Sequence, residues 1–470
     1  MTTNRLFTTL LFFVLPAPAL AQRPVLSTWT RSFLAVDTPV IALTHVTVID
    51  GTGAPARNDQ TILLRDGRIE RVGATAQVTI PPAVKVIDLT GHTVIPGLVA
   101  LHEHTYLGGL SHPAPMMHSA LLYLASGVTT AMTAGSMQPY NELNIKRLVD
   151  AGELPGPRLH ITGPYLTGPR ANPDAFRIIE SAEEASRVVN YWADEGATWF
   201  KILSGPTSVV RAVVSAAHAR GLKVTAHLCS VTFTEGARLG VDALQHGFIT
   251  NSEYVPGKQP DVCPSSNQKA QADVDPASAE VRASIRRIVA AGAAVVSTLG
   301  TYESFVLSRT RLDTAEMAML APSVRREVEE THSALASSSF TVPERLLTRM
   351  MQWERLFVAA GGLLGAGSDP WGTGFMPGDG NLRNYELLIE AGFTAPVAVQ
   401  IMTLNGARIL GEHERTGSVE PGKAADLVVI RGNLSANARA IRNVTLVFRG
   451  GHGFDPIKLR NEARGKLGAH

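Results

Sequence analysis

Residue types that bind divalent metal ions occur in this chain at positions that could bring them together. His102 and His104 are separated only by Glu103, so both imidazoles can serve one ion. A chain of 470 residues with 14 histidines contains such a pair by chance roughly 0.4 times, so the spacing alone is a weak signal. Whether the pair belongs to a metal site depends on its place in the fold. Four further residues of ligand type would have to lie beside it: Lys201, His227, His246 and Asp369.

A run of alternating strands and helices is expected to position these side chains. Eight apolar, strand-like segments alternate with amphipathic helical stretches, at residues 94–99, 129–133, 158–162, 198–203, 222–226, 243–245, 294–299 and 363–366. Residues 181–196 show the helical spacing, and we expect this helix on the outside of the fold. Strands that alternate with helices pair in parallel through right-handed crossovers, and eight such units close a barrel. The sequence predicts an α/β fold, a (β/α)8 TIM barrel.

Each candidate ligand lies at the C-terminal end of a different predicted strand. His102 and His104 follow the first strand, and the others lie at the ends of the fourth, fifth, sixth and eighth: Lys201, His227, His246 and Asp369. Enzymes with this fold keep their active sites on the face where these ends meet. Convergence of four histidines, a lysine and an aspartate on that face predicts a metal site. The other ten histidines, such as His45 and His92, are interpreted as structural.

Both ends of the chain contain short β-rich segments that suit a second, smaller domain. They lie at residues 42–49, 61–64 and 84–89, and again at 417–420, 426–431 and 444–449. We predict a β-sandwich made from residues 22–95 and 412–470, with the barrel at 96–411 between them. Two unusually long connections, 248–280 and 300–343, are candidate lids over the site.

The N-terminus has the features of a secretory signal peptide. Arg5 precedes an apolar run at residues 10–15, and Ala19-Leu20-Ala21 follows. Removal of residues 1–21 would leave Gln22 first and place the protein in the periplasm or outside the cell. A short membrane anchor is the alternative, although the run is much shorter than the about 20 residues needed to span a bilayer.

The overall charge balance points to small partners. The formal net charge is +2, and no dense Lys/Arg block predicts nucleic-acid or membrane-surface binding. A small-molecule or short-peptide substrate is expected, and a homo-oligomer is left open. The two cysteines, Cys229 and Cys263, provide no disulfide framework. Both follow barrel strands, so a single bridge and two free thiols are both open.

Lys201 differs from the other candidate ligands, because a protonated lysine cannot bind a metal. Its neighbours in the strand Trp199-Phe200-Lys201-Ile202-Leu203 are apolar, which favours an inward, buried amine with a lowered pKa. The neutral amine can take up carbon dioxide to form a carbamate, which is a bridging carboxylate. The alternative is an ammonium group paired with Asp369.

Two segments that flank the barrel resemble the amidohydrolase superfamily. Residues 94–99, VIPGLV, stand before His102-Glu103-His104 like that superfamily's opening motif, and residues 416–428, TGSVEPGKAADLV, resemble its return into the β-domain. The resemblance covers about residues 40 to 450. The order of Lys, two His and Asp is similar to the binuclear subtype with a carboxylated lysine, which includes imidazolonepropionase-like exported dipeptidases of the prolidase and carboxypeptidase kind.

That subtype implies two divalent metal ions, with zinc as the first expectation. It places His102, His104 and Asp369 on one metal and His227 and His246 on the other, bridged by Lys201 as its carbamate. The sequence departs from the family pattern at two positions, Ala100 where an aspartate is usual and Glu103 where a small or apolar residue is usual. Glu103 could support the histidines or point between barrel and helix.

The predicted function is hydrolysis of an amide bond, peptide-like or N-acyl amino acid, by a metal-bridging hydroxide with Asp369 as proton shuttle. The same machinery could act on lactones, carbamates or phosphoesters. A mononuclear deaminase would need an acidic residue near His227, and Glu235 is the nearest. A non-catalytic binding protein is the remaining class. Substrate-binding residues are unknown; the candidates are Tyr106, His160, Tyr165, Arg170 and Tyr302, and a dipeptidase would hold its substrate carboxylate with an arginine.

Overall fold

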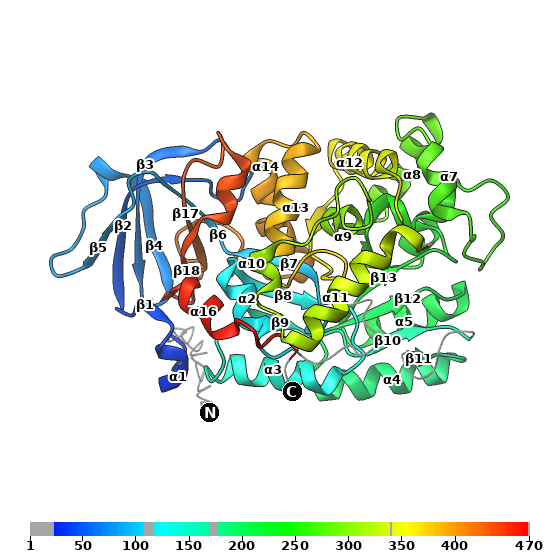
Figure 1. Cartoon of the computed structure of the whole chain (residues 1–470), viewed down its shortest axis with the longest axis horizontal. Helices are drawn as coiled ribbons and strands as arrows, with labels where there is room; N and C mark the ends of the chain where they lie inside the picture. The colour runs from blue at the N-terminus through cyan, green and yellow to red at the C-terminus, as the bar shows by residue number, and fades with distance from the viewer. Residues whose placement is uncertain (1–22, 108–115, 170–175, 339–340, 469–470) are drawn as a thin grey trace, which may run out of the picture.

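The strands of this protein form two separate sheets. The computed structural model describes residues 23–107, 116–169, 176–338 and 341–468. In Figure 1 the smaller sheet lies at the left and combines blue strands with the orange-red strands β17 and β18, whereas the parallel sheet and its helices fill the rest of the molecule. No helix in these ranges is both long and apolar enough to cross a membrane. The predicted signal peptide, residues 1–21, lies outside the described residues.

The larger sheet contains ten strands, all paired in parallel, in the order β11-β10-β12-β13-β14-β15-β16-β7-β8-β9. Their bounds are β7 (Leu98–Glu103), β8 (Val128–Thr133), β9 (Arg158–His160), β10 (Tyr165–Thr167), β11 (Arg177–Ile178), β12 (Trp199–Leu203), β13 (Lys223–His227), β14 (Ala243–Gln245), β15 (Ala294–Ser297) and β16 (Leu364–Ala366). Each of the eight predicted strands has a counterpart here, and the sequence missed β10 and β11. Across the described ranges, the ladder runs from β11 to β9, and closure into a barrel is not detected.

The first predicted strand, 94–99, spans a change of sheet. Its beginning belongs to β6 (His92–Pro96) of the smaller sheet, and β7 begins only at Leu98. Gly97 stands between the two. A Cβ there would lie 2.1 Å from the Thr129 hydroxyl oxygen, so only glycine allows the chain to pass so close to β8.

Helices connect successive strands of the larger sheet, and α4 shows why they form. Helix α4 (Ala182–Glu195) begins after Ser181, whose hydroxyl accepts a hydrogen bond from the Glu184 amide, and ends at Gly196 with φ 112°. The helix predicted for 181–196 is confirmed. The other helices are α1 (Thr28–Arg31), α2 (Ser119–Ala125), α3 (Pro139–Asp150), α5 (Thr207–Ala219), α6 (Phe233–Arg238), α7 (Asn267–Asp273), α8 (Ala279–Ala290), α9 (Leu299–Glu303), α10 (Thr314–Met317), α11 (Pro322–Ala334), α12 (Glu344–Ala359), α13 (Asp379–Glu390), α14 (Ala395–Gln400), α15 (Gly406–Leu410) and α16 (Pro456–Ala463).

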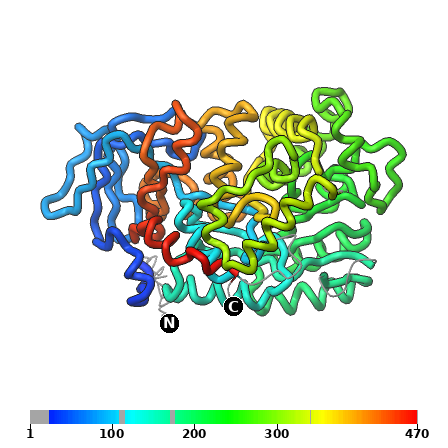
Figure 2. The backbone as a smooth tube through the Cα atoms, in the orientation of Figure 1, coloured from blue at the N-terminus to red at the C-terminus, as the bar shows by residue number. Residues whose placement is uncertain are grey.

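Both ends of the described chain contribute to the smaller sheet, as predicted, and Figure 2 shows the blue and red segments together. Its nine strands are hydrogen-bonded into one mixed sheet in the order β1-β19-β18-β17-β6-β2-β3-β4, with β5 also paired to β2. The further bounds are β1 (Leu34–Val36), β2 (Val40–Val48), β3 (Arg57–Arg65), β4 (Arg68–Ala74), β5 (Lys85–Asp88), β17 (Leu427–Arg431), β18 (Val444–Arg449) and β19 (His452–Phe454). The smaller sheet is stabilised by a separate hydrophobic core, which includes Leu43, Leu64, Val429 and Phe448.

One sequence-based expectation about a strand is wrong. Residues 417–420 form no strand; the Val419 amide donates to the Asp50 carbonyl and no ladder follows. The two long connections, which the sequence marks as candidate lids, contain helices: α7 lies within 248–280, and α10 and α11 lie within 300–343.

Candidate metal centre

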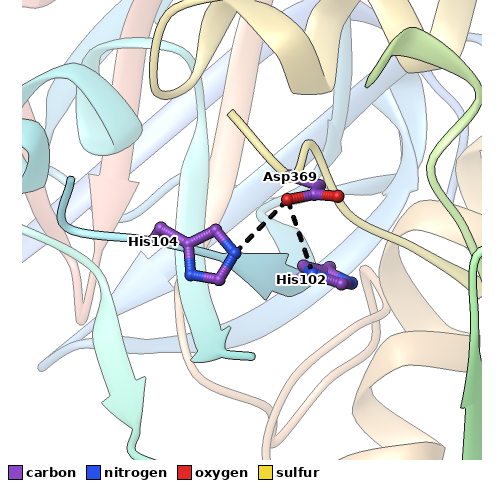
Figure 3. A group of neighbouring side chains, drawn as sticks. All are labelled: His102, His104 and Asp369. Atoms are coloured by element: carbon purple, nitrogen blue, oxygen red, sulfur yellow. Dashed lines mark ion pairs between the residues drawn. The ribbon is translucent and has the colours of Figure 1, made fainter. Parts of the chain in front are cut away.

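Asp369 lies beside His102 and His104, although it is far from them in the sequence. His102 and His104 stand at and just beyond the end of β7, and Asp369 follows β16 (Figure 3). The nearer Asp369 oxygen lies 3.6 Å from Nε2 of His102 and 3.3 Å from Nε2 of His104. One ligand atom from each residue falls within 4.8 Å of the others, a spacing that could hold a metal ion.

The backbone conformation around Asp369 allows its close approach to His102 and His104. Its amide donates a 2.8 Å hydrogen bond to the His102 carbonyl. A Cβ at Gly367 would lie 2.3 Å from the His102 nitrogen, so glycine is required two residues before the aspartate. Asp369 and His246 both adopt positive φ, 44° and 69°, a region that non-glycine residues seldom occupy. Such conformations cluster at functional sites.

The remaining predicted ligands lie on the same cavity. Lys201 is in β12, His227 ends β13 and His246 follows β14. The His246 ring centroid lies 4.6 Å from that of His102 and 4.5 Å from that of His227. All six side chains line one cavity of about 630 Å³. The structure therefore brings together every residue that strand-end position had selected.

Polar side chains from other parts of the larger sheet and its loops orient two of the histidines. Gln245 Oε1 accepts from Nδ1 of His102 at 2.6 Å, and Thr298 Oγ1 lies 2.9 Å from Nδ1 of His246. Gln245 is itself held by a 2.5 Å bond to Thr225 Oγ1. A histidine whose Nδ1 is occupied in this way presents Nε2 as a fixed metal ligand. Sequence reasoning missed both partners.

Glu103 supports the aspartate loop rather than a metal. Its carboxylate accepts a 2.9 Å hydrogen bond from the Ser368 amide and a second, short one from the Ser368 hydroxyl. Burial raises the pKa of Glu103 to about 7. The sequence left open whether Glu103 supports the histidines or points between barrel and helix, and its carboxylate instead holds the residue that precedes Asp369.

Burial shifts Lys201 and three of the histidines in this cavity towards their neutral forms. It lowers the pKa of Lys201 to about 7, with Asp369 opposing the shift, and lowers the pKa of His227 to about 4. Burial also holds the pKa values of His102 and His246 well below the usual range. Lys201 Nζ and His104 Nδ1 are buried with no hydrogen-bond partner among the described residues. Neutral donors with unused lone pairs fit divalent cations.

Not every residue predicted for the pocket lies in it. Tyr106, Tyr165 and Tyr302 line the cavity, but His160 does not; it lies 3.4 Å from a Glu412 oxygen. Arg170 lies outside the described residues. The sequence missed three aromatic lining residues, Phe176, Phe305 and Trp371. Nothing in the residue types around these three positions distinguishes them from aromatic residues of a hydrophobic core.

Both long connections contribute to the cavity wall. Cys263, Asn267 and Gln268 come from 248–280, and Tyr302 and Val342 from 300–343. The two cysteines, which the sequence left open, are joined as a Cys229–Cys263 disulfide with 4.9 Å between their Cα atoms. The bridge ties the first connection to the segment that follows His227.

Glu235, which a deaminase would need as its acid, has a structural role. Its carboxylate accepts 2.9 Å hydrogen bonds from the Thr232 amide and hydroxyl, while its own amide donates to the same hydroxyl. This capping box begins helix α6. Glu235 is not among the residues that line the cavity.

Known proteins resemble this chain in sequence and in fold. An N-acyl-D-aspartate deacylase from Alcaligenes xylosoxydans xylosoxydans is 34% identical over 107 residues, which is 22% of this chain and 20% of that protein. A solved structure from Bifidobacterium longum, named as a candidate prolidase, has 26% identity and a TM-score of 0.65, and covers 90% of this chain and 98% of its own. A bottromycin amidohydrolase has 20% identity, a TM-score of 0.70 and coverage of 94% and 95%.

The match to the curated deacylase is partial, since it spans only about a fifth of that protein's length. The family comparison covers far more. The model of the amidohydrolase family matches residues 93–452, from β6 to β19, and so includes all six candidate ligands. The chain belongs to the amidohydrolase family.

Proposed function

We propose that this protein is a metal-dependent hydrolase that cleaves a carbon–nitrogen amide bond. The observation that carries the proposal is the convergence of six ligand-type side chains on one cavity, where burial lowers the pKa values of Lys201 and His227. Membership of the amidohydrolase family supports the reaction class. A peptide-like or N-acyl amino acid bond is the substrate bond that we propose.

The site would hold two divalent ions, with zinc as the first candidate. His102, His104 and Asp369 would hold one ion, and His227 and His246 the other. Lys201 would bridge them after its neutral Nζ adds to carbon dioxide and releases a proton, which gives the binuclear subtype with a carboxylated lysine. Bound ions would polarise the substrate carbonyl and acidify a water molecule.

Asp369 is proposed to move the proton that the reaction requires. Its carboxylate would accept a proton as water attacks the carbonyl carbon, and would deliver it to the nitrogen as the C–N bond breaks. The products are one carboxylic acid and one amine, so atoms and charge balance. Ser368, held by Glu103, fixes the backbone on which Asp369 is carried.

Two other readings are weaker. The deaminase reading lacks its acid, because Glu235 is committed to the cap of α6. A non-catalytic binding protein would not need a complete ligand set. Lactones, carbamates and phosphoesters remain alternative substrates for the same site, and they belong in the test.

The test is to compare native, metal-depleted and zinc-restored protein against dipeptides, N-acyl amino acids, neutral amides, lactones and phosphotriesters. We expect amide hydrolysis to disappear on depletion and to return with zinc. Amide cleavage that is unaffected by depletion would contradict the proposal, as would metal-restored protein that cleaves only lactones or phosphotriesters.

We also propose that the parallel sheet closes as a (β/α)8 barrel, with the β-sandwich domain and domain bounds given above. Support comes from the amides of Thr198 and Trp199, which both donate to the Ile161 carbonyl just after β9. Export to the periplasm or outside the cell is supported by the Cys229–Cys263 bridge, because disulfides persist in oxidising compartments. An exported protein whose N-terminal residue is Met1 rather than Gln22 would contradict the signal-peptide assignment.

A further inference from the structure

The cavity continues outward from the candidate ligands between two aromatic walls. The first wall consists of Tyr106, Tyr165 and Phe176. The Tyr106 ring stacks on His104 with centroids 4.8 Å apart, and Tyr165 lies 6.2 Å from His104 and 5.7 Å from Phe176. The Tyr106 and Tyr165 hydroxyls are hydrogen-bonded to each other at 2.7 Å, so their polar ends are satisfied within the wall.

The second wall consists of Tyr302, Phe305 and Trp371. Tyr302 meets His246 at 5.5 Å between centroids, Phe305 lies 6.5 Å from Tyr302, and Trp371 lies 6.1 Å from Phe305 at an interplanar angle of 61°. Phe305 and Trp371 are each partly exposed. They can therefore bury further apolar surface when a ligand ring lies against them.

Few charged side chains occur among the described residues that line this cavity. Among the described lining residues, the only lysine and the only acid are Lys201 and Asp369, both in the candidate metal centre, and none is an arginine. A substrate carboxylate or ammonium group lying between the walls would lose its hydration without gaining a charged partner there. Burial of an unpaired charge is strongly unfavourable. The walls therefore select against the free termini of a dipeptide.

We infer that the substrate is a neutral amide with an aromatic or similarly large apolar group lying against Phe305 and Trp371. The inference rests on the proposed amide hydrolysis and narrows its substrates to neutral amides, in preference to the N-acyl amino acids and dipeptides that carry a free carboxylate. A cavity of about 630 Å³ is in the range that encloses molecules of drug-like size. In this account Phe305 and Trp371 determine specificity and take no part in the bond cleavage.

Three matched substrates test the inference in the zinc-loaded enzyme. N-benzoyl-phenethylamine is neutral, N-benzoyl-phenylalanine adds only a carboxylate, and N-acetyl-phenethylamine replaces the ring of the acyl group by a methyl. We expect kcat/KM for the first to exceed each of the others by at least about tenfold. Preference for the carboxylate compound would overturn the inference, and loss of that preference in Arg170→Ala would identify the residue responsible.

Two substitutions test whether the second wall causes the preference for the benzoyl group. Phe305→Leu and Trp371→Ala should each reduce the benzoyl-to-acetyl ratio of kcat/KM by at least about fivefold, since an aromatic contact is lost. Trp29→Ala is the matched control, because Trp29 is 44% exposed and lies in α1, away from the cavity lining. An unchanged ratio in both wall variants would overturn the assignment.

A binding measurement separates this inference from the proposed function. Calorimetry with Asp369→Asn protein should show tighter binding of N-benzoyl-phenethylamine than of N-benzoyl-phenylalanine. If this preference holds but no amide, including alanyl-proline, is cleaved by the native enzyme, the proposed hydrolysis fails and the cavity selectivity stands. If alanyl-proline is cleaved while neutral aromatic amides neither bind nor react, hydrolysis stands and the substrate class fails.

Discussion

Lys201 is the residue whose surroundings most strongly require a partner. Its amine belongs to a buried side chain within β12, has no hydrogen-bond partner among the described residues, and has its pKa lowered to about 7 by burial. A permanently charged ammonium in this position would be costly. Conversion to a carbamate would make the same side chain an anionic ligand.

Replacement of Lys201 by alanine should therefore release metal. We expect Lys201→Ala to lower metal affinity by more than about tenfold and to lose most activity, with partial recovery in short carboxylic acids that replace the bridging carboxylate. Metal analysis and activity with added formate or acetate are the measurements. Lys85→Ala, at an exposed position of β5, is the control. Full activity with two metals in Lys201→Ala would rule out the carbamate.

Asp369 should affect turnover more than metal binding. Asp369→Asn keeps the shape of the side chain but removes its ability to accept a proton, and five other candidate ligands persist. We expect kcat to fall about 10²- to 10⁴-fold while much of the metal remains. Asp194→Asn, an exposed change in α4, serves as control. Near-normal turnover with both metals present would make Asp369 a structural residue.

For single residues, the sequence predicted which candidate ligands lie on one cavity but not the side chains that hydrogen-bond to them. Parallel strand ends meet at one face, so position along the chain was enough to select Lys201 and Asp369. The Gln245 bond to His102 joins residues 143 positions apart and depends on side-chain approach between strands. Nothing in local spacing predicts such a contact. Phe305 and Trp371 were missed for the same reason.

The connection after β14 is the element whose attachment is easiest to test. Besides the Cys229–Cys263 bridge, the Lys258 amine donates to the Ser230 carbonyl and Asp261 accepts from the Thr207 amide. The bridge closes a chain segment with a sequence separation of 34 residues. It therefore restricts the unfolded chain as well as the cavity wall.

We expect Cys229→Ser/Cys263→Ser protein to lose about 2–4 kcal/mol of unfolding free energy. The measurement is urea unfolding with and without reductant. Reductant should destabilise the wild type and have no effect on the double variant, which is its own control. A wild-type midpoint that reductant leaves unchanged would mean that the bridge contributes no stability.

Elements with strong local signals were predictable, and those fixed by tertiary contacts were not. The capped, amphipathic segment 181–196 became α4, with its start and end set by Ser181 and Gly196. Residues 417–420 have strand-like composition but belong to no strand of either sheet. The switch from β6 to β7 at Gly97 was hidden inside one apolar run.

For the whole molecule, a buried carboxyl group predicts how stability varies with pH. The Glu354 carboxyl group is buried in α12, and burial raises its pKa from 4.5 to about 8 against a smaller opposing effect of Ser297. A folded-state pKa above the unfolded value means that the folded protein binds more protons between these limits. Stability from this group is therefore lost as pH rises from 4.5 to about 8.

Glu354→Gln should remove the decrease in stability that this group causes as the pH rises. We expect the urea midpoint of wild-type protein to fall between pH 5.5 and pH 8.5 by more than the midpoint of the variant. Glu330→Gln, an exposed change in α11, should follow the wild type. Identical pH dependence in wild type and Glu354→Gln would show that Glu354 has no abnormal proton affinity in the folded protein.

The central claim is that this amidohydrolase family member uses two metal ions in one cavity to cleave amides. The most direct measurement is the rate of amide hydrolysis as zinc is added to metal-depleted native protein, with bound metal counted in the same samples. The account predicts no cleavage without metal and a plateau at about two ions per chain. Cleavage at full rate without metal, a plateau at one ion, or no cleavage at any zinc concentration would contradict it.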